Sequence, residues 1–315
     1  SARKVLVSAA CVLGLAATAA PVLSLAAASP AAAAAPSSAA GSGLPTPGIY
    51  HAPIIGKVVT SILGQLLGGN SVRHATNVQS SNWGGYADGN DTYNSVAASW
   101  TEPTVNCGSS SGGGGILGGL LGGVGLGGLI GSSGSAASFW VGIDGYTSSS
   151  VEQLGTDADC NGSTPDYYAW WEMYPNPSDV ITTSSAYPVH PGDQITAWVV
   201  SNSSGTSFYL SEKDTTAGWT FSTTQTASGF ARSSAEVVAE APSSCSLLFC
   251  SEVPLSNFGQ VSFTNADVID NSGTNGPLSG FAANEITMAS NGKTLAVPST
   301  LSSDGRSFSI SWQNS

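Results

Sequence analysis

Alternation of hydrophobic and polar residues runs through most of the chain after residue 80 and predicts β-strands. Val96, Ala98 and Trp100 alternate with polar or small neighbours, which is the period of a strand with one buried face. The same alternation recurs in "DQITAWVVSNSSGTSFYLSEK", "GWTFSTTQT", "GQVSFTNADVI" and "GRSFSISWQ", and turn sequences such as "HPGD" and "SDGR" separate these segments. Since no segment carries a clear helical stripe, we expect an all-β sandwich of one domain over residues 77–315.

A Gly/Leu/Ile tract without charge, residues 108–135, interrupts this pattern. Its glycine content disfavours a stable helix. We expect an inserted loop that takes no part in chemistry.

The first 35 residues have the pattern of a secretory signal peptide. Arg3 and Lys4 precede a long Ala-rich apolar run, and sites of A-x-A type follow it near residues 28–35. Pro21 and the alanine content disfavour a transmembrane anchor. We therefore expect export, which permits disulfides.

Residues 36–76 differ in composition from the segments on either side and are expected to be a propeptide or linker. "PSSAAGSGLPTPG" is typical of a linker, while "IIGKVVTSILGQLLGG" predicts a short amphipathic helix. The segment has no acidic residue but holds Lys57 and Arg73, so it suits an inhibitory propeptide that lies on an acidic body. A disordered tether is the alternative.

Charge is unevenly distributed along the chain. All 20 acidic residues lie from Asp88 onward, so a mature chain beginning near Asn77 carries four basic and 20 acidic residues, a formal net charge of −16. Such a surface repels nucleic acid and anionic membranes, and we expect neither as a partner. Below about pH 3 most carboxylates are neutral, and few positive charges remain to unfold the chain. The composition therefore suits acidic surroundings.

Four cysteines remain once Cys11 leaves with the signal peptide. Cys245 and Cys250 bracket "CSLLFC" and are expected to close a small loop, which leaves Cys107 with Cys160.

Metal and cofactor sites are not expected. No C-x-x-C occurs, and the histidines have no ligand spacing. The tract of residues 108–135 has no lysine at its end to form a phosphate loop. One histidine, His190, lies in "YPVHPGD", a turn sequence.

Familiar catalytic machinery is also missing, because D-T-G and D-S-G do not occur and the single histidine of residues 77–315 lies in a turn sequence, which disfavours a Ser-His-Asp triad. What remains is a set of carboxylates and tryptophans on predicted strands. In "SAEVVAEAP" a period of two puts Glu236 and Glu240 on one face. The same period groups Trp170 with Glu172 in "YYAWWEMYP" and Trp140 with Asp144 in "FWVGIDG". Acids and indoles on these faces would line a groove.

Several motifs in order resemble a known family. "SSNWGGY", "SFWVGIDG" with "VEQLGTD", "YYAWWEMYP", "SAEVVAEAP" and "GQVSFTNA" are similar to successive motifs of the glutamic peptidases, or eqolisins, in particular their bacterial members, over nearly all of residues 80–312. The resemblance implies a sandwich of two large antiparallel sheets of the concanavalin-like jelly-roll type. It also implies a secreted endopeptidase that is made as a proenzyme, acts in acid on polypeptides and is insensitive to pepstatin. We expect a monomer.

The resemblance also assigns residues. It makes Gln153 and Glu240 the catalytic dyad. Glu240 would take a proton from water and return it to the leaving amine, and the Gln153 amide would donate to the oxyanion. Glu152 would point away and matter less. The positions that match the lining of the family's cleft are Trp83, Trp140, Asp144, Trp170 and Glu172.

The match has two departures, and both leave the shape of the subsites open. The insertion at 108–135 is longer than expected, and Val237 stands where an aromatic residue is common.

Two other functions fit the same residues. A glycosidase would use Glu172 with Glu240, or Glu236 with Glu240, and stack sugars on the tryptophans. A non-catalytic adhesin or carbohydrate-binding module would bind without forming product.

Overall fold

The computed structural model describes residues 48–62, 76–108, 134–181, 186–246 and 249–313, all within one compact unit, Ala35–Ser315. The predicted signal peptide, residues 1–35, and nearly all of the tract 108–135 lie outside the described residues. None of the described helices is long and apolar enough to cross a membrane.

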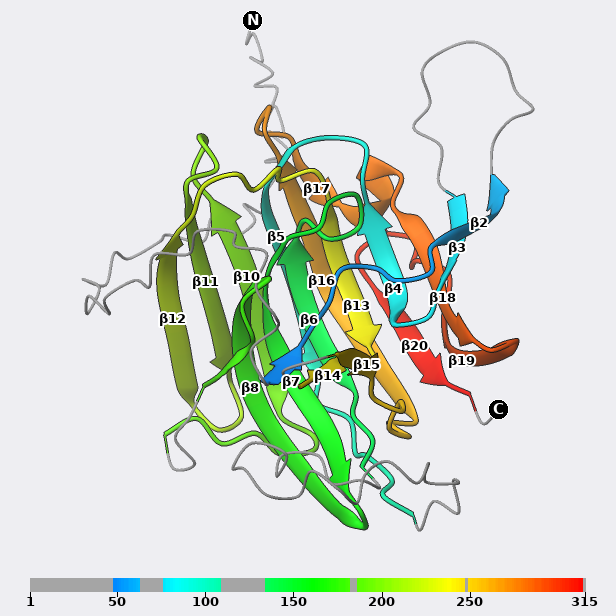
Figure 1. Ribbon diagram of the computed structural model, residues 1–315. Helices are drawn as coiled ribbons and strands as arrows, with labels where there is room; N and C mark the ends of the chain where they lie inside the picture. The colour runs from blue at the N-terminus through cyan, green and yellow to red at the C-terminus, as the bar shows by residue number, and fades with distance from the viewer. Residues whose placement is uncertain (1–47, 63–75, 109–133, 182–185, 247–248, 314–315) are drawn as a thin grey trace, which may run out of the picture. The chain divides into compact units, whose positions relative to one another are not determined.

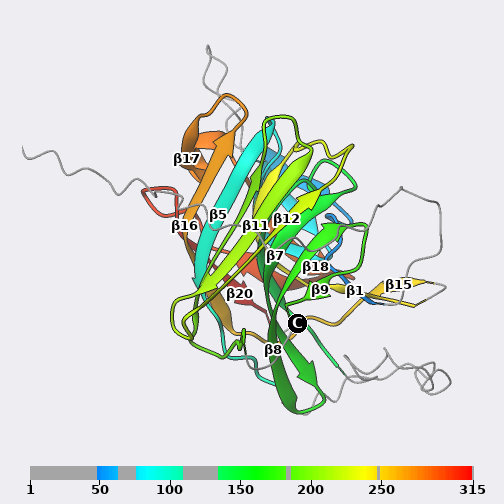
Figure 2. The ribbon, with the colours of Figure 1, turned by 90° about the vertical axis from the view of Figure 1, so that its left-hand side faces the viewer.

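The strands form two facing layers joined along one edge (Figure 1). The first layer has the order β12–β11–β10–β5–β16, and in Figure 2 β16, β5, β11 and β12 run side by side. Its strands are β5 (Tyr93–Thr101), β10 (Gln194–Ser201), β11 (Ser207–Asp214), β12 (Trp219–Thr226) and β16 (Gln260–Asp270).

The second layer has the order β8–β7–β6–β13–β4–β18 and carries the residues of the predicted site. Its strands are β4 (Trp83–Asp88), β6 (Ser138–Ile143), β7 (Val151–Asn161), β8 (Thr164–Tyr174), β13 (Ala235–Glu240) and β18 (Asn284–Ser290). From β18 the chain of pairings continues through β19 (Lys293–Pro298) and β20 (Phe308–Trp312) to β16.

The remaining elements are short. They are β1 (Gly48–Tyr50), β2 (Val58–Ile62), β3 (Thr76–Ser80), β9 (Asp179–Val180), β14 (Ser243–Cys245), β15 (Cys250–Glu252), β17 (Asn275–Pro277) and the 3₁₀ turn η1 (Leu278–Phe281). Among the named strands, only the pairing of β3 with β18 is parallel. The predicted antiparallel sandwich is confirmed.

Alternate residues of the second layer face two different clusters. Phe139 of β6 and Val237 of β13 belong to the large core between the layers, and Trp140 and Val238 belong to a second, smaller cluster. The period of two in the sequence therefore predicts the two faces of these strands correctly. Because both clusters are buried, the outer face of β6 and β13 is covered as well.

Both predicted disulfides are present. Cys107 bonds to Cys160, which ties the segment after β5 to β7, and Cys245 bonds to Cys250 across the hairpin of β14 and β15. The first closes the longer loop, with a sequence separation of 53. A chain-entropy estimate for such a loop is about 4 kcal/mol of stabilisation.

The helix predicted for "IIGKVVTSILGQLLGG" is wrong over the part that the structure describes. Residues 54–57 carry no regular secondary structure, and Val58–Ile62 form strand β2, which pairs antiparallel with β3. Neighbouring β-branched residues favour a strand once a pairing edge is available. Val58 and Val59 remain more than half exposed there. The rest of the predicted helix, from residue 63, lies outside the described residues.

His190 lies in a turn, as predicted. Its backbone N–H donates to Asp193 Oδ2 at 2.7 Å, and its carbonyl accepts the N–H of Asp193 at 3.1 Å.

Candidate active site

Glu240 is the last residue of β13, the strand between β4 and β6. Its side chain is fully buried. Trp140 Nε1 donates to Glu240 Oε2 at 2.9 Å, and Asn82 Nδ2 donates to Oε1 at 3.2 Å. Burial raises the pKa of Glu240 well above its ordinary value and Glu172 raises it further, while nearby His51 and the two hydrogen bonds lower it.

Gln153 lies on β7, opposite Gly142 of β6 and Glu172 of β8. Its Nε2 donates to the backbone carbonyl of His51 at 2.5 Å and to Glu172 Oε2 at 3.1 Å. A Cβ added at Gly142 would lie 2.7 Å from the ring of Trp140 and 3.2 Å from Gln153 Cβ. Glycine at this position therefore lets the amide and the indole approach each other.

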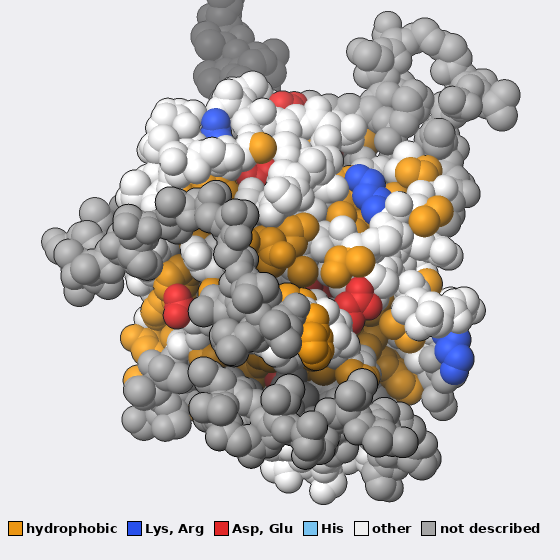
Figure 3. Space-filling view, in the orientation of Figure 1, with side chains coloured by type: hydrophobic (Ala, Val, Ile, Leu, Met, Phe, Trp, Pro, Cys, Tyr) orange, Lys and Arg blue, Asp and Glu red, His pale blue; other side chains and the backbone are white. Residues whose placement is uncertain are grey.

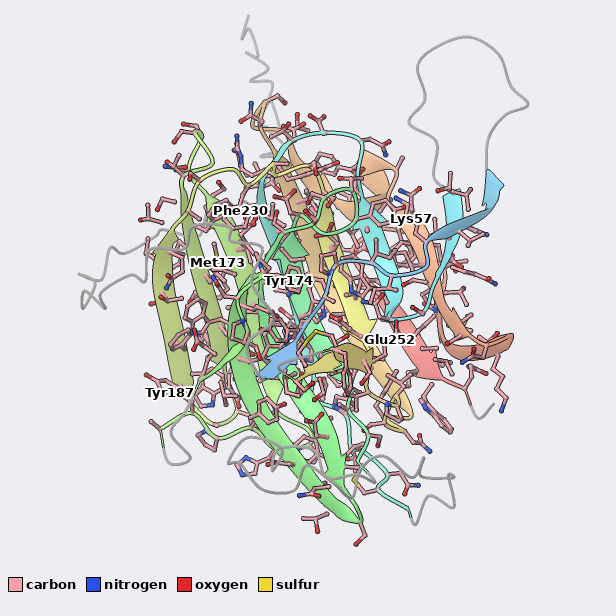
Figure 4. The ribbon with its side chains drawn as sticks, viewed as in Figure 1. Lys57, Met173, Tyr174, Tyr187, Phe230 and Glu252 are labelled. Carbon is pink, nitrogen blue, oxygen red and sulfur yellow. A yellow bond between two sulfur atoms is a disulfide. The ribbon has the colours of Figure 1, made fainter. Side chains whose placement is uncertain are left out.

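Residues 48–57 cross the outer face of this layer, and we call them the strap (Figure 1). One end is fixed by the pairing of β1 with β14 and by an edge-to-face contact of Tyr50 with Tyr174, whose ring centroids are 6.1 Å apart. At the other end Lys57 Nζ lies 3.5 Å from the ring centroid of Tyr146 and donates to its carbonyl at 3.2 Å. Figure 4 shows Tyr174 and Lys57 towards opposite ends of the strap.

The centre of the strap is held through its main chain. Asn82 Nδ2 and Trp83 Nε1 both donate to the carbonyl of Ala52, at 3.2 and 3.0 Å. Asn82 Oδ1 accepts the N–H of Ile55 at 2.8 Å. Asn82 therefore contacts Glu240 and the strap at the same time.

His51 occupies the middle of the strap and is fully buried. Its ring stacks on Trp170, with centroids 3.3 Å apart and planes 2° apart. Nδ1 lies 3.1 Å from Glu172 Oε2, and Nε2 lies 3.4 Å from Asp157 Oδ1. Burial alone would lower the pKa of His51, but the two carboxyl groups outweigh it and raise the pKa to about 10.

Glu172 links His51 to the predicted dyad. Its Oε2 accepts from the backbone N–H of His51 at 2.9 Å as well as from Gln153. Burial raises the pKa of Glu172 to about 7, even though His51 and Gln153 lower it. The Glu172 carboxylate therefore takes up a proton as the pH falls below about 7.

The predicted site residues fall into two groups. Six are buried and meet the strap or one another: Gln153, Glu240, Trp83, Trp140, Trp170 and Glu172. The seventh, Asp144, instead accepts the backbone N–H groups of Arg232 and Ser233 at 2.7 and 2.8 Å, so its carboxylate holds the segment before β13. Glu152 is also buried, although a solvated residue is the ordinary expectation for an acid on a strand.

Three residues of the site were not singled out from the sequence: His51, Asn82 and Asp157. Asn82 adjoins the predicted Trp83, and Asp157 shares its face of β7 with Gln153 at a spacing of four. Those neighbours were the available signals. His51 had none, because its partners lie about a hundred residues away.

The glycosidase pair Glu236 and Glu240 does not fit the geometry. Four residues along one strand span about 13 Å, beyond the separation of about 5 to 9.5 Å between the carboxyl groups of known glycosidases. The pair Glu172 and Glu240 shares its site with a bound peptide segment rather than with an open sugar groove. Figure 3 shows hydrophobic side chains gathered at the centre of this face.

A buried carboxyl group and amide that surround a peptide segment on a β-sandwich define a peptide-binding site. The comparisons with known proteins identify the family. Residues 81–312 match the model of the Peptidase A4 family. The chain therefore belongs to this family of glutamic peptidases, or eqolisins, and is a protease.

Relatives of known identity agree. The chain is 33% identical to Aspergillopepsin-2 of Aspergillus niger over 211 residues, 63% of this chain and 67% of that protein. A scytalido-glutamic peptidase bound to a peptide-based transition-state analogue is 26% identical, with a TM-score of 0.57 over 74% of this chain and 98% of that one. The eqolisin SCP-B, in complex with the tripeptide Ala-Ile-His, is 25% identical, with a TM-score of 0.56 over the same shares.

Proposed function

We propose that this protease is a secreted endopeptidase that acts in acid and hydrolyses peptide bonds with Gln153 and Glu240. The observation that carries the proposal is the backbone carbonyl of His51, which lies 2.5 Å from Gln153 Nε2. The strap is a peptide, so its position is a guide to where a substrate lies. The peptide complexes of two relatives support polypeptides as substrates.

The reaction needs a base, an acid and an oxyanion donor. The Glu240 carboxylate takes a proton from water, and the hydroxide oxygen bonds to the scissile carbonyl carbon. The carbonyl oxygen becomes an oxyanion and accepts a hydrogen bond from Gln153 Nε2, a donor typically worth about 10² to 10³ in rate. Glu240 then returns its proton to the amide nitrogen, the carbon–nitrogen bond breaks, and the new carboxyl group and amine leave.

The pH at which hydrolysis proceeds depends on how well water reaches Glu240. In the closed state burial raises its pKa, so the carboxyl is protonated in acid. Departure of the strap hydrates the carboxyl and removes much of the cause of the shift. The base form then becomes available in mildly acidic solution, where a Glu ordinarily titrates.

We also propose that the strap keeps the proenzyme inactive. Its main chain occupies Gln153, Asn82 and Trp83, and a substrate would need the same groups. Export is supported by the two disulfides, since such bonds persist in oxidising compartments. The formal charge of residues 77–315 supports a protein that binds neither nucleic acid nor anionic membranes. The expectation of a monomer is unchanged.

Replacing each member of the dyad tests the mechanism. Glu240→Gln and Gln153→Ala should each give a folded, secreted protein with almost no proteolysis of casein at pH 3 to 4. Circular dichroism confirms the fold, and Glu252→Gln is the control, because that glutamate contacts Ser81 Oγ rather than the dyad. Substantial residual activity in either dyad variant would refute the assignment.

A further inference from the structure

The site that holds the His51 side chain has a definite shape and chemistry. Its floor is the indole of Trp170, on which the ring lies flat at 3.3 Å. Glu172 lies at one ring nitrogen, at 3.1 Å, and Asp157 lies at the other, at 3.4 Å. Protonated imidazole is planar and carries an N–H donor at both of these positions.

The walls of this site are held by the body of the protein. Trp170 Nε1 donates to Asp157 Oδ1 at 2.8 Å, and the Tyr168 hydroxyl donates to Oδ2 at 2.8 Å. Gln153 Nε2 donates to Glu172 Oε2 at 3.1 Å. All of these residues lie on β7 and β8. The site is therefore preorganised and does not depend on the strap for its shape.

The main chain of the strap shows which substrate residue this site would receive. The carbonyl of His51 accepts from Gln153, and the next carbonyl, that of Ala52, accepts from Trp83 and Asn82. The carbonyl group of the peptide bond between His51 and Ala52 thus lies at Gln153. The side-chain site belongs to the residue on the amino side of that bond.

We infer that this site is a specificity subsite for protonated histidine, so that the protease cleaves preferentially after histidine. We call it the His subsite, and its residues are Asp157, Trp170 and Glu172. The inference rests on the proposed function, because Gln153 marks the scissile carbonyl. Phenylalanine keeps the stacking but offers Glu172 and Asp157 neither the N–H groups nor the charge of an imidazolium, a mismatch that sites built for hydrogen bonding reject strongly. Lysine brings charge but no flat ring.

Matched peptides test the inference. The full chain is first exposed to pH 3 to 4, and kcat/KM is then measured for peptides that differ only at X in Tyr-X-Ala, with X as His, Phe or Lys. Mass spectrometry locates the cut. We expect kcat/KM for His to exceed that for Phe by about tenfold or more at pH 5. Equal values for His and Phe, or for His and Lys, would overturn the subsite.

Casein separates this inference from the proposed function. If the acid-treated chain digests casein but shows no preference for His, the subsite is wrong and the peptidase mechanism stands. If it digests neither casein nor any peptide, the proposed function itself fails.

A variant pair gives a second, independent measurement. Asp157→Asn should lower the ratio of kcat/KM for His over Phe several-fold, because it removes charge at one ring nitrogen. Asp159→Asn is the matched control, since Asp159 lies two residues along the same strand and accepts from the same Tyr168 hydroxyl at 3.0 Å. It should change the ratio much less. A parallel loss for both peptides in Asp157→Asn would indicate a purely structural role and refute the subsite.

Discussion

Stability should fall as the pH rises towards neutrality, and Glu102 is the residue on which this is best tested. Glu102 is buried in the sandwich, where its Oε2 accepts from Thr156 Oγ1 at 2.5 Å and from Trp100 Nε1 at 3.4 Å. Burial raises its pKa from 4.5 to about 8, although both hydrogen bonds act in the opposite direction. Glu102 is outside the proposed dyad and His subsite.

The direction in which the free energy of unfolding changes with pH follows from proton binding. A pKa raised in the folded state means that the native protein holds this proton more tightly than the unfolded chain does. The stabilisation is complete below about pH 4.5 and is lost as the pH rises towards 8. Since each pH unit corresponds to about 1.36 kcal/mol per proton, one such group lowers the free energy of unfolding by roughly 3 kcal/mol between pH 4.5 and 7. That is a large part of a typical stability of about 5 to 15 kcal/mol.

Urea unfolding at pH 4, 5, 6 and 7 measures the effect. Every chain carries Glu240→Gln, so that self-digestion does not interfere. The parent chain should lose several kcal/mol over this range, and Glu102→Gln should remove roughly 3 kcal/mol of that loss because glutamine cannot ionise. Asp166 is exposed on β8, so Asp166→Asn is the control and should leave the slope unchanged. Parallel pH dependences for Glu102→Gln and its parent would refute the reasoning.

Two further predictions concern the strap and Asn82, which binds it. N-terminal sequencing after exposure to pH 3 should find a new terminus at Ala52, because the bond after His51 lies at Gln153. Glu240→Gln should abolish this cut. A first cut elsewhere in the strap would contradict the placement of the His51–Ala52 bond at Gln153. Asn82→Ala should lower kcat on casein at least about tenfold, since hydrogen bonds to charged groups contribute roughly 1.5 to 3 kcal/mol. An unchanged kcat would show that Asn82 serves the strap alone.

Much of the second layer was predictable because strand alternation is a local property. The period of two in "SFWVGID" and "SAEVVAE" separates Trp140 and Glu240 from the residues that face the core, and the structure keeps that separation. The period of two does not predict which strands pair with each other in the sheet. The placement of β13 between β4 and β6, which brings Trp140 to Glu240, involves residues 100 positions apart.

The conformation of the strap could not be predicted from its own sequence. Its sequence "GIYHAPIIGK" has an extended, turn-like composition around Pro53, and nothing local indicates that His51 enters a buried site. The amphipathic pattern of residues 54–69 predicted a helix, but pairing with β3 supplies main-chain hydrogen bonds that the pattern does not anticipate. A tertiary contact therefore decided the conformation against the local preference.

Burial of acids predicts that the protein is more stable in acid than at neutral pH, and the position of His51 modifies this dependence at the site. Buried glutamates include Glu172 and Glu240 at the site and Glu102 nearby, and each has a raised pKa from burial. In the closed chain the His51 imidazolium offsets part of this cost at Glu172 and Glu240. When the strap leaves, that positive charge leaves with it, and water reaches the two carboxyl groups in its place. Glu102, whose partners Thr156 and Trp100 lie outside the strap, keeps its raised pKa. The stability of the chain without the strap should therefore still fall as the pH rises towards neutrality.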